Sequence, residues 1–136
     1  MKNHANKSRK SARVLIVDDD RRVLGALSQQ LKEIGCSCVT CDNGSEAMLQ
    51  FASGRVDLVV TDLTMPGVDG FSVINLIRSE SAVPIIVVTG HFDDYQEVLG
   101  RYENITTLRK PFGPAWFVAQ VQSAIATLGV PNARAS

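Results

Sequence analysis

The chain has 136 residues, 14 basic and 14 acidic side chains, a formal net charge of zero, and a hydrophobic fraction of 45%. That length is enough for one domain with its own core, without disulfides or a structural metal. The charge balance gives no support for nucleic-acid binding, and no apolar stretch approaches the roughly 20 residues needed to cross a membrane. We therefore expect one soluble, cytoplasmic domain that binds neither a nucleic acid nor a membrane.

Both ends of the chain are polar. Residues 1–11 are basic and lack the apolar core of a signal peptide, so they are predicted to form a flexible tail. The domain itself is placed at residues 12–130. Residues 131–136 are interpreted as a C-terminal tail or as the start of a truncated linker, which leaves an output domain beyond them open.

The first half of the domain alternates between strand and helix patterns. Gly35 is placed to end a first helix, and a second helix is predicted from Ser45 to Gly54. The inward face of the first helix consists of apolar residues at helical spacing, namely Val23, Leu24, Leu27, Leu31 and Ile34. Strands are predicted at three apolar runs, over residues 13–17, 36–40 and 56–61.

The second half continues the alternation after a loop that contains Pro66 and two glycines. A third helix begins near Phe71, and a short, weakly anchored helix is predicted from Phe92 to Gly100. Strands are predicted over 83–88 and 105–108. The last helix, which Gly129 and Pro131 would stop, has as its inward face Phe117, Val121, Ala124, Ile125 and Leu128. Alternating strands and helices indicate an α/β fold with a parallel sheet.

Cys38 and Cys41 form a C-x-x-C pattern that is compatible with redox or zinc chemistry. No second Cys/His pair is present, and Cys36 and Cys38 alternate as strand residues do. Buried free thiols, which behave as small hydrophobic groups, are the favoured interpretation.

Four of the predicted strands end in groups that phosphoryl chemistry uses. They are followed by Asp18 and Asp19, by Asp62, by Thr89 and by Lys110. In a parallel sheet the carboxyl ends of the strands share one edge, so these side chains should converge. Proline after Lys110 favours an extended conformation there, which places Lys110 at a strand end.

This set of groups fits a phosphorylation site that contains a metal. Three crowded carboxylates repel one another unless a cation is present, and a hard ion such as Mg²⁺ suits carboxylate ligands. Asp62, at the end of the most apolar strand, is the candidate nucleophile for an aspartyl phosphate. Thr89 would then hydrogen-bond the phosphoryl group and Lys110 would pair with it. Taken singly, each residue has a plainer interpretation, such as a helix N-cap for the acids.

The segments VLIVDDD, VVTDLTMPGVDG, IIVVTG and LRKPF resemble the signature segments of response-regulator receiver domains of two-component signalling, over about residues 12–130. The resemblance implies a doubly wound (βα)5 flavodoxin-like fold, with a five-stranded parallel sheet of order 2-1-3-4-5. It also implies that Asp62 accepts a phosphoryl group from the phosphohistidine of a sensor histidine kinase or histidine phosphotransfer protein. The domain would catalyse that transfer to itself and would not be an enzyme with a separate substrate.

The same resemblance implies roles for the neighbouring residues. Asp18, Asp19, Asp62 and the backbone carbonyl of Thr64 would bind Mg²⁺, and Thr89 would be the switch threonine. The Lys110–Pro111 bond is cis in many members of the family. Gly90 would leave the phosphoryl group accessible, and His91 is either an exposed loop residue or a modulator of phosphoryl lifetime.

The sequence departs from the family at Thr107, where many receivers carry an aromatic switch residue. We expect phosphorylation to change the face of the fourth helix, fifth strand and fifth helix without an aromatic rotamer change. Thr107 also leaves open an adaptor that binds partners without being phosphorylated.

Two other classes fit less well. An aspartyl-phosphate phosphatase would carry a second acid two residues after Asp62, where this chain has Thr64. A flavodoxin-like flavin carrier would place its phosphate beside Asp18 and Asp19, which would repel it.

Partner surfaces are only partly readable. By the resemblance, the kinase would dock on the first helix, where Arg21, Arg22 and Leu24 lie near the start. Trp116 and Phe117 are adjacent and cannot both face inward on a helix, so one of them is predicted to lie on a partner or homodimer face. The downstream target is not specified by the sequence.

Overall fold

The computed structural model describes residues 11–64, 67 and 69–128. Among these residues, no helix combines the length and the apolar character that a membrane span requires. The predicted tails at 1–11 and 131–136 lie outside the described residues except for Ser11, and so do Pro66 and the predicted helix stops at Gly129 and Pro131.

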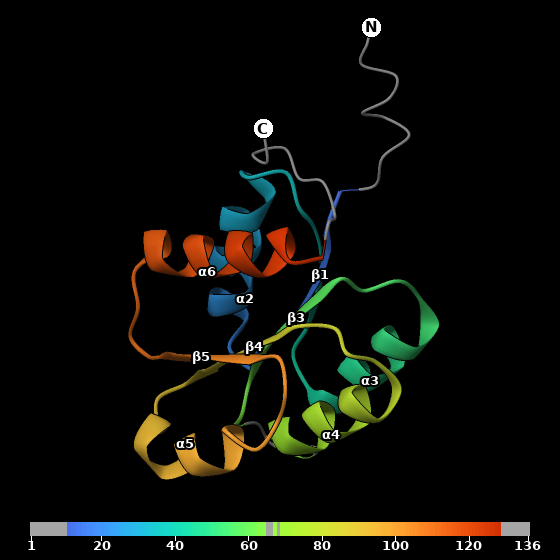
Figure 1. Ribbon diagram of the computed structural model, residues 1–136. Helices are drawn as coiled ribbons and strands as arrows, with labels where there is room; N and C mark the ends of the chain where they lie inside the picture. Colours follow the sequence, from blue (N-terminus) through green and yellow to red (C-terminus); the bar gives the residue numbers. More distant parts are fainter. Residues whose placement is uncertain (1–10, 65–66, 68, 129–136) are drawn as a thin grey trace, which may run out of the picture.

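The centre of the molecule is a parallel sheet of five strands in the order β2-β1-β3-β4-β5 (Figure 1). The strand bounds are β1 Arg13–Val17, β2 Ser37–Cys41, β3 Leu58–Asp62, β4 Ile85–Thr89 and β5 Ile105–Arg109. The order and the parallel direction confirm the predicted doubly wound fold. β1, β3 and β4 occupy the middle, which explains why their sequences are apolar almost throughout.

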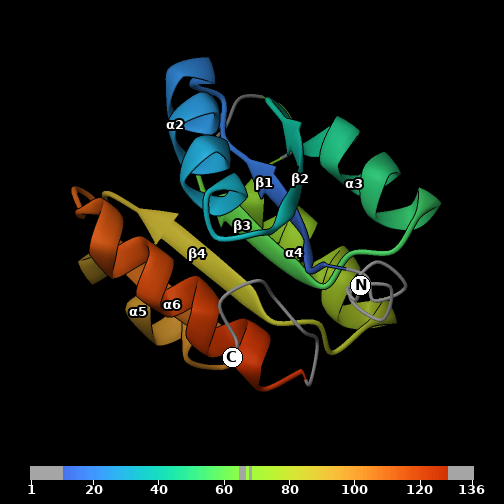
Figure 2. The ribbon, with the colours of Figure 1, turned by 90° about the horizontal axis from the view of Figure 1, so that it is seen from above.

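Helices cover both faces of the sheet (Figures 1 and 2). Their bounds are α2 Arg21–Lys32, α3 Gly44–Ser53, α4 Gly70–Glu80, α5 Phe92–Leu99 and α6 Pro114–Ala126. α2 and α6 pack on one face, and α3, α4 and α5 pack on the other. α5 has Leu99 as its single buried residue, which confirms the prediction of a short, weakly anchored helix.

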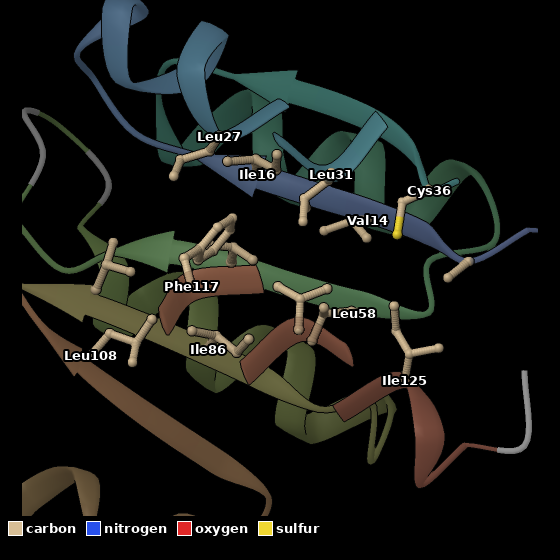
Figure 3. Packing of buried hydrophobic residues seen from close by; sticks show 14 of the residues in the cluster. Val14, Ile16, Leu27, Leu31, Cys36, Leu58, Ile86, Leu108, Phe117 and Ile125 are labelled. Atoms are coloured by element: carbon tan, nitrogen blue, oxygen red, sulfur yellow. The ribbon is translucent and has the colours of Figure 1, made fainter. Parts of the chain in front are cut away.

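Alternating side chains of each strand divide the core into two clusters. In β1, Val14 and Ile16 face α2 and α6, whereas Leu15 and Val17 face the other three helices. The first cluster centres on Phe117, which is fully buried between α6 and the sheet (Figure 3). Each such buried apolar side chain contributes about 1.5–3 kcal/mol relative to exposure.

Acidic and amide side chains cap three of the helices. Asp20 accepts a hydrogen bond from the Arg22 amide at the start of α2, Asn43 caps α3, and Asp69 caps α4. These caps satisfy amide groups that have no partner within the helix. The plainer interpretation of the acidic run therefore holds for Asp20 alone.

Several predicted boundaries were wrong by one or two residues. The second strand begins at Ser37 rather than Cys36, and the second helix begins at Gly44 because Asn43 provides its cap. Leu128 was predicted to face inward but is 36% exposed. α6 ends at Ala126, so Leu128 no longer follows the buried face of the helix.

The two cysteines of the C-x-x-C pattern lie on opposite faces of the sheet. Cys38 packs against the α2 and α6 side, and Cys41 is buried on the other side. All three cysteines are free thiols, and burial raises the pKa of Cys36 and of Cys41 to about 11. This placement prevents Cys38 and Cys41 from binding one metal ion together.

Arg78 of α4 fastens the edge of the sheet where β4 and β5 begin. Its guanidinium donates to the backbone carbonyls of Ser81, Glu103 and Asn104 at 2.9, 3.0 and 3.2 Å. One side chain therefore ties the segment after α4 to the segment that enters β5.

Candidate functional site

The register of the sheet brings the predicted site residues together. Val17 pairs with Thr61, so Asp18 and Asp62 follow as the next residues on neighbouring strands. Asp62 pairs with Val88, one position before Thr89. Thr89 in turn pairs with Arg109, and Lys110 comes next. The convergence predicted from the strand ends is therefore present along one edge.

Asp18, Asp19 and Asp62 form a cluster in which one carboxylate oxygen of each lies within 4.8 Å of the others. Asp18 is 1% exposed and Asp62 is 7% exposed, whereas Asp19 is open to solvent. Burial raises the pKa of Asp18, against the opposing effects of the Asp20 amide and of Lys110. Clustered, partly buried carboxylates suit a hard divalent cation that keeps some of its waters, so the residues fit Mg²⁺.

Lys110 links the two buried acids. Its Nζ lies 3.0 Å from Asp62 Oδ2 and 3.3 Å from Asp18 Oδ2. Burial opposes the charge on Lys110, but the hydrogen bond and attraction from Asp62, together with Asp18, raise its pKa overall. The lysine follows β5 directly, and its bond to Pro111 is cis, as the resemblance implied.

The carboxylate of Asp62 is held at both oxygens. Oδ1 accepts a hydrogen bond of 3.2 Å from the Thr64 amide, and Oδ2 accepts from Lys110. This contact places Thr64 beside the site, and the role of its carbonyl as a metal ligand stays a prediction. A carboxylate fixed in this way needs little reorganisation before it attacks.

Gly70 packs directly against the backbone of Asp62, which the sequence analysis did not anticipate. A Cβ atom at Gly70 would overlap the carbonyl oxygen of Asp62 and lie 2.6 Å from Leu63 Cα. The Gly70 amide also donates to the Leu63 carbonyl at 3.0 Å. The first residue of α4 therefore sets the position of the strand end that carries Asp62, and only glycine fits there without a shift.

Thr89 is completely buried, and its Oγ1 accepts a 2.9 Å hydrogen bond from the His91 amide. A hydroxyl can accept and donate at the same time, so its O–H remains available to a phosphoryl oxygen. Gly90 and His91 are both exposed beside it. Acid cluster, lysine and hydroxyl together form a site for an anion with several oxygens.

Comparison with known proteins identifies the family of the chain. The family model for the response regulator receiver domain matches residues 14–122. The chain belongs to this receiver family of two-component systems.

Curated relatives agree with the assignment. The receiver is 35% identical over 122 residues to a probable transcriptional regulator, ycf27, from Cyanidium caldarium, covering 89% of this chain and 49% of that protein. It is 34% identical to the DNA-binding response regulator MtrA of Mycolicibacterium smegmatis, over 83% of this chain and 50% of the relative. The chain thus spans about half the length of the curated relatives it matches.

Solved structures show the same architecture along nearly their whole length. The response regulator TrrA of Thermotoga maritima, crystallised with Mg²⁺ and BeF, is 32% identical with a TM-score of 0.76, covering 83% of this chain and 98% of TrrA. The chemotaxis response regulator CheY4 of Vibrio cholerae is 28% identical with a TM-score of 0.77, covering 85% and 99%.

Thr107, where the resemblance led us to expect an aromatic residue, lies half-buried in β5. Aromatic side chains instead gather between α4 and α5, where Phe71 meets Tyr95. Sequence reasoning missed this group because no short motif contains both residues. It correctly expected one of Trp116 and Phe117 to face outward, since Trp116 is 57% exposed and Phe117 is fully buried.

Arg21 and Arg22, the proposed docking residues on α2, are both exposed. Arg21 donates to Asp42 at the end of β2 at 3.0 Å, and Arg22 lies 3.6 Å from Asp20. Exposed pairs of this kind contribute little to stability. The two arginine side chains are 85% and 94% exposed, so a partner can reach them.

Proposed function

We propose that this receiver accepts a phosphoryl group on Asp62, in a reaction that depends on Mg²⁺, and that phosphorylation changes a protein-interaction face. The observation that carries the proposal is the group of three carboxylates within 4.8 Å with Lys110 Nζ 3.0 Å from Asp62. A site built only for stability would not gather three carboxylates beside a lysine that bonds two of them, Asp18 and Asp62, because the third carboxylate adds repulsion.

The donor is the phosphohistidine of a sensor histidine kinase or histidine phosphotransfer protein. A carboxylate oxygen of Asp62 forms a bond to phosphorus while the phosphorus–nitrogen bond breaks, and its electron pair stays on the imidazole. The product is an acyl phosphate on Asp62 and a histidine that takes up a proton from water. We expect this exchange to take place in the cytoplasm.

Asp18, Asp19, Asp62 and the Thr64 carbonyl would hold Mg²⁺, which when bound neutralises charge on the phosphoryl oxygens. Lys110 exchanges its contact with Asp62 for a phosphoryl oxygen and keeps its charge throughout. Thr89 donates its hydroxyl hydrogen to another oxygen. Each of these roles uses a group already fixed by the sheet edge, so transfer requires little rearrangement.

The receiver acts on itself, both in taking up the phosphoryl group and in losing it to water, and has no separate turnover substrate. Gly90 leaves space beside Thr89, since nothing lies within 4 Å of a Cβ built there. Exposed His91 stands next to that opening and is proposed to modulate phosphoryl lifetime. An unchanged rate of dephosphorylation in His91→Ala would count against that role.

Intact mass after incubation with Mg²⁺ and acetyl phosphate tests the proposal. The expected result is one added phosphoryl group on the natural chain, and none on Asp62→Asn or without Mg²⁺. Absence of added mass on a chain whose circular dichroism shows an intact fold would reject phosphorylation. That outcome would favour an adaptor that binds its partner without modification, which Thr107 leaves open.

A further inference from the structure

Tyr95 of α5 lies between two parts of the phosphorylation site. Its ring meets Phe71 of α4 edge-on, with centroids 5.3 Å apart, and meets the His91 ring at 6.5 Å in the same orientation. Both separations are in the range where aromatic pairs attract each other. Tyr95 and Phe71 are half-buried against the core cluster of that face.

Phe71 and His91, the two ring neighbours of Tyr95, are each connected to a residue of the site. Phe71 follows Gly70, whose backbone abuts Asp62 and Leu63. His91 donates its amide hydrogen to Thr89 Oγ1 at 2.9 Å. The aromatic group therefore joins the two segments that carry the phosphoacceptor and the switch hydroxyl.

We propose that Tyr95 is a positioning residue of this receiver, which holds the His91 amide against Thr89 and the start of α4 against Asp62. The inference rests on the proposed phosphorylation of Asp62. The ring does this work and the hydroxyl does not, because the contacts of Tyr95 are between rings. α5 is short and has one buried residue, and the ring contacts of Tyr95 help to fix its first turn together with the contacts of Arg109 to Phe92 and Asp93.

This arrangement bears on signalling because β5 carries Thr107, a small β-branched residue, and not an aromatic residue. The aromatic contact near Thr89 is made by Tyr95 of α5, whose ring meets that of His91. A change at Thr89 on phosphorylation would reach α5 and α4 through His91 and Tyr95 directly.

The test compares Tyr95→Ala, Tyr95→Leu and Tyr95→Phe with the natural chain. Tyr102→Ala is the matched control, because Tyr102 is also half-buried but bonds Asn75 of α4 at 2.6 Å near the end of the sheet remote from the site. Two quantities are measured: the rate of phosphorylation by acetyl phosphate with Mg²⁺, and hydrogen exchange of the His91 amide in the unphosphorylated protein.

Tyr95→Ala is expected to slow phosphorylation and to speed His91 exchange by about threefold to tenfold each, the size associated with one aromatic contact. Tyr95→Leu should show most of the same change, since it keeps apolar volume without a ring. Tyr95→Phe should restore both values, and Tyr102→Ala should alter neither even if it lowers the melting temperature.

The two proposals fail in different ways. If the natural chain takes no phosphoryl group, the proposed function fails and His91 exchange alone decides the role of Tyr95. Exchange at the natural rate in folded Tyr95→Ala and Tyr95→Leu would overturn the inference. If the natural chain is phosphorylated, a phosphorylation rate in both variants equal to that of the natural chain would also overturn the inference.

Discussion

Lys110 lies between two buried acids, with its Nζ 3.0 Å from Asp62 and 3.3 Å from Asp18. Before any phosphoryl group arrives, the lysine already compensates part of the carboxylate charge. The same side chain therefore supports the fold in the resting protein and would bind the anion in the reaction. Replacing Lys110 therefore tests its contribution to the stability of the resting protein.

Lys110→Met should lower the free energy of unfolding in the absence of Mg²⁺ by about 1–2 kcal/mol, because the partly exposed ammonium no longer offsets the repulsion between Asp18 and Asp62. Addition of Mg²⁺ should recover more stability in the variant than in the natural chain. Thermal melts with and without Mg²⁺ measure both. Arg101→Met, at an exposed position, is the control, and an equal loss in the two variants would contradict the role of Lys110.

Asp18→Asn should have the opposite effect on stability. The neutral amide removes a buried charge and its repulsion with Asp62, so the melting temperature without Mg²⁺ should rise. The stabilisation that Mg²⁺ gives to the natural chain should shrink, since a ligand is lost. Asp20→Asn keeps a good N-cap at α2 and should leave the Mg²⁺ response unchanged. A full Mg²⁺ response in Asp18→Asn would show that this acid is not a ligand.

Gly70→Ala should destabilise the receiver by about 2 kcal/mol or more, because the new methyl group must displace the backbone of Asp62 and Leu63. Gly25→Ala is the matched control. It lies in α2 with nothing within 4 Å of a built Cβ, and alanine there should stabilise the helix by about 0.5–1 kcal/mol. Denaturant unfolding measures both. Equal stability of Gly70→Ala and the natural chain would mean that the strand end has room to move.

The rate at which Cys36 and Cys41 are alkylated should be low near neutral pH and should rise with pH. At pH 8, thiols with a pKa of about 11, as at Cys36 and Cys41, are ionised to about one part in 1,000. Raising the pH therefore increases their thiolate fraction about tenfold per unit up to that pKa, whereas unfolded thiols level off above about 8.5. Peptide mass spectrometry after iodoacetamide treatment should find slow labelling of both in the native protein. Rapid labelling at pH 7, with urea-unfolded chain as the reference, would contradict their burial.

Phosphorylation should change amide exchange over residues 90–112 without an aromatic switch at position 107. The comparison is between the free protein and the phosphorylated protein, followed by mass spectrometry of peptides. Peptides from β1 serve as the internal control, because its residues lie in the buried centre of the sheet. Identical exchange over 90–112 in the two forms would remove this hypothesis.

Most of the site could be predicted from the sequence because it depends on two regular features. Apolar runs of strand length mark the buried strands, and a parallel sheet places the residues that follow them on one edge. Asp18, Asp62, Thr89 and Lys110 were found in this way. Their positions needed no knowledge of side-chain packing, since each follows directly from its place at a strand end.

Other contacts could not be predicted, for a different reason. The approach of Gly70 to Asp62 depends on how the first residue of α4 packs against the end of β3. From the sequence alone, a glycine after Pro66 is equally well explained as a turn residue. Tyr95 meets Phe71 across 24 positions of sequence, and no periodicity connects them. The exposed position of Leu128 depends on where α6 ends, and boundaries are the least certain part of any sequence-based assignment.

Arg78 has a consequence for how the sheet can deform. Its hydrogen bonds fix the segments that enter β4 and β5, whereas Thr89 and Lys110 lie at the opposite ends of those strands. A guanidinium stays charged at any pH at which the protein is folded, so this attachment does not weaken as conditions change. The two strands are therefore fixed to α4 at the end of the sheet away from the site. We expect a displacement of Thr89 and Lys110 to leave this anchored end in place.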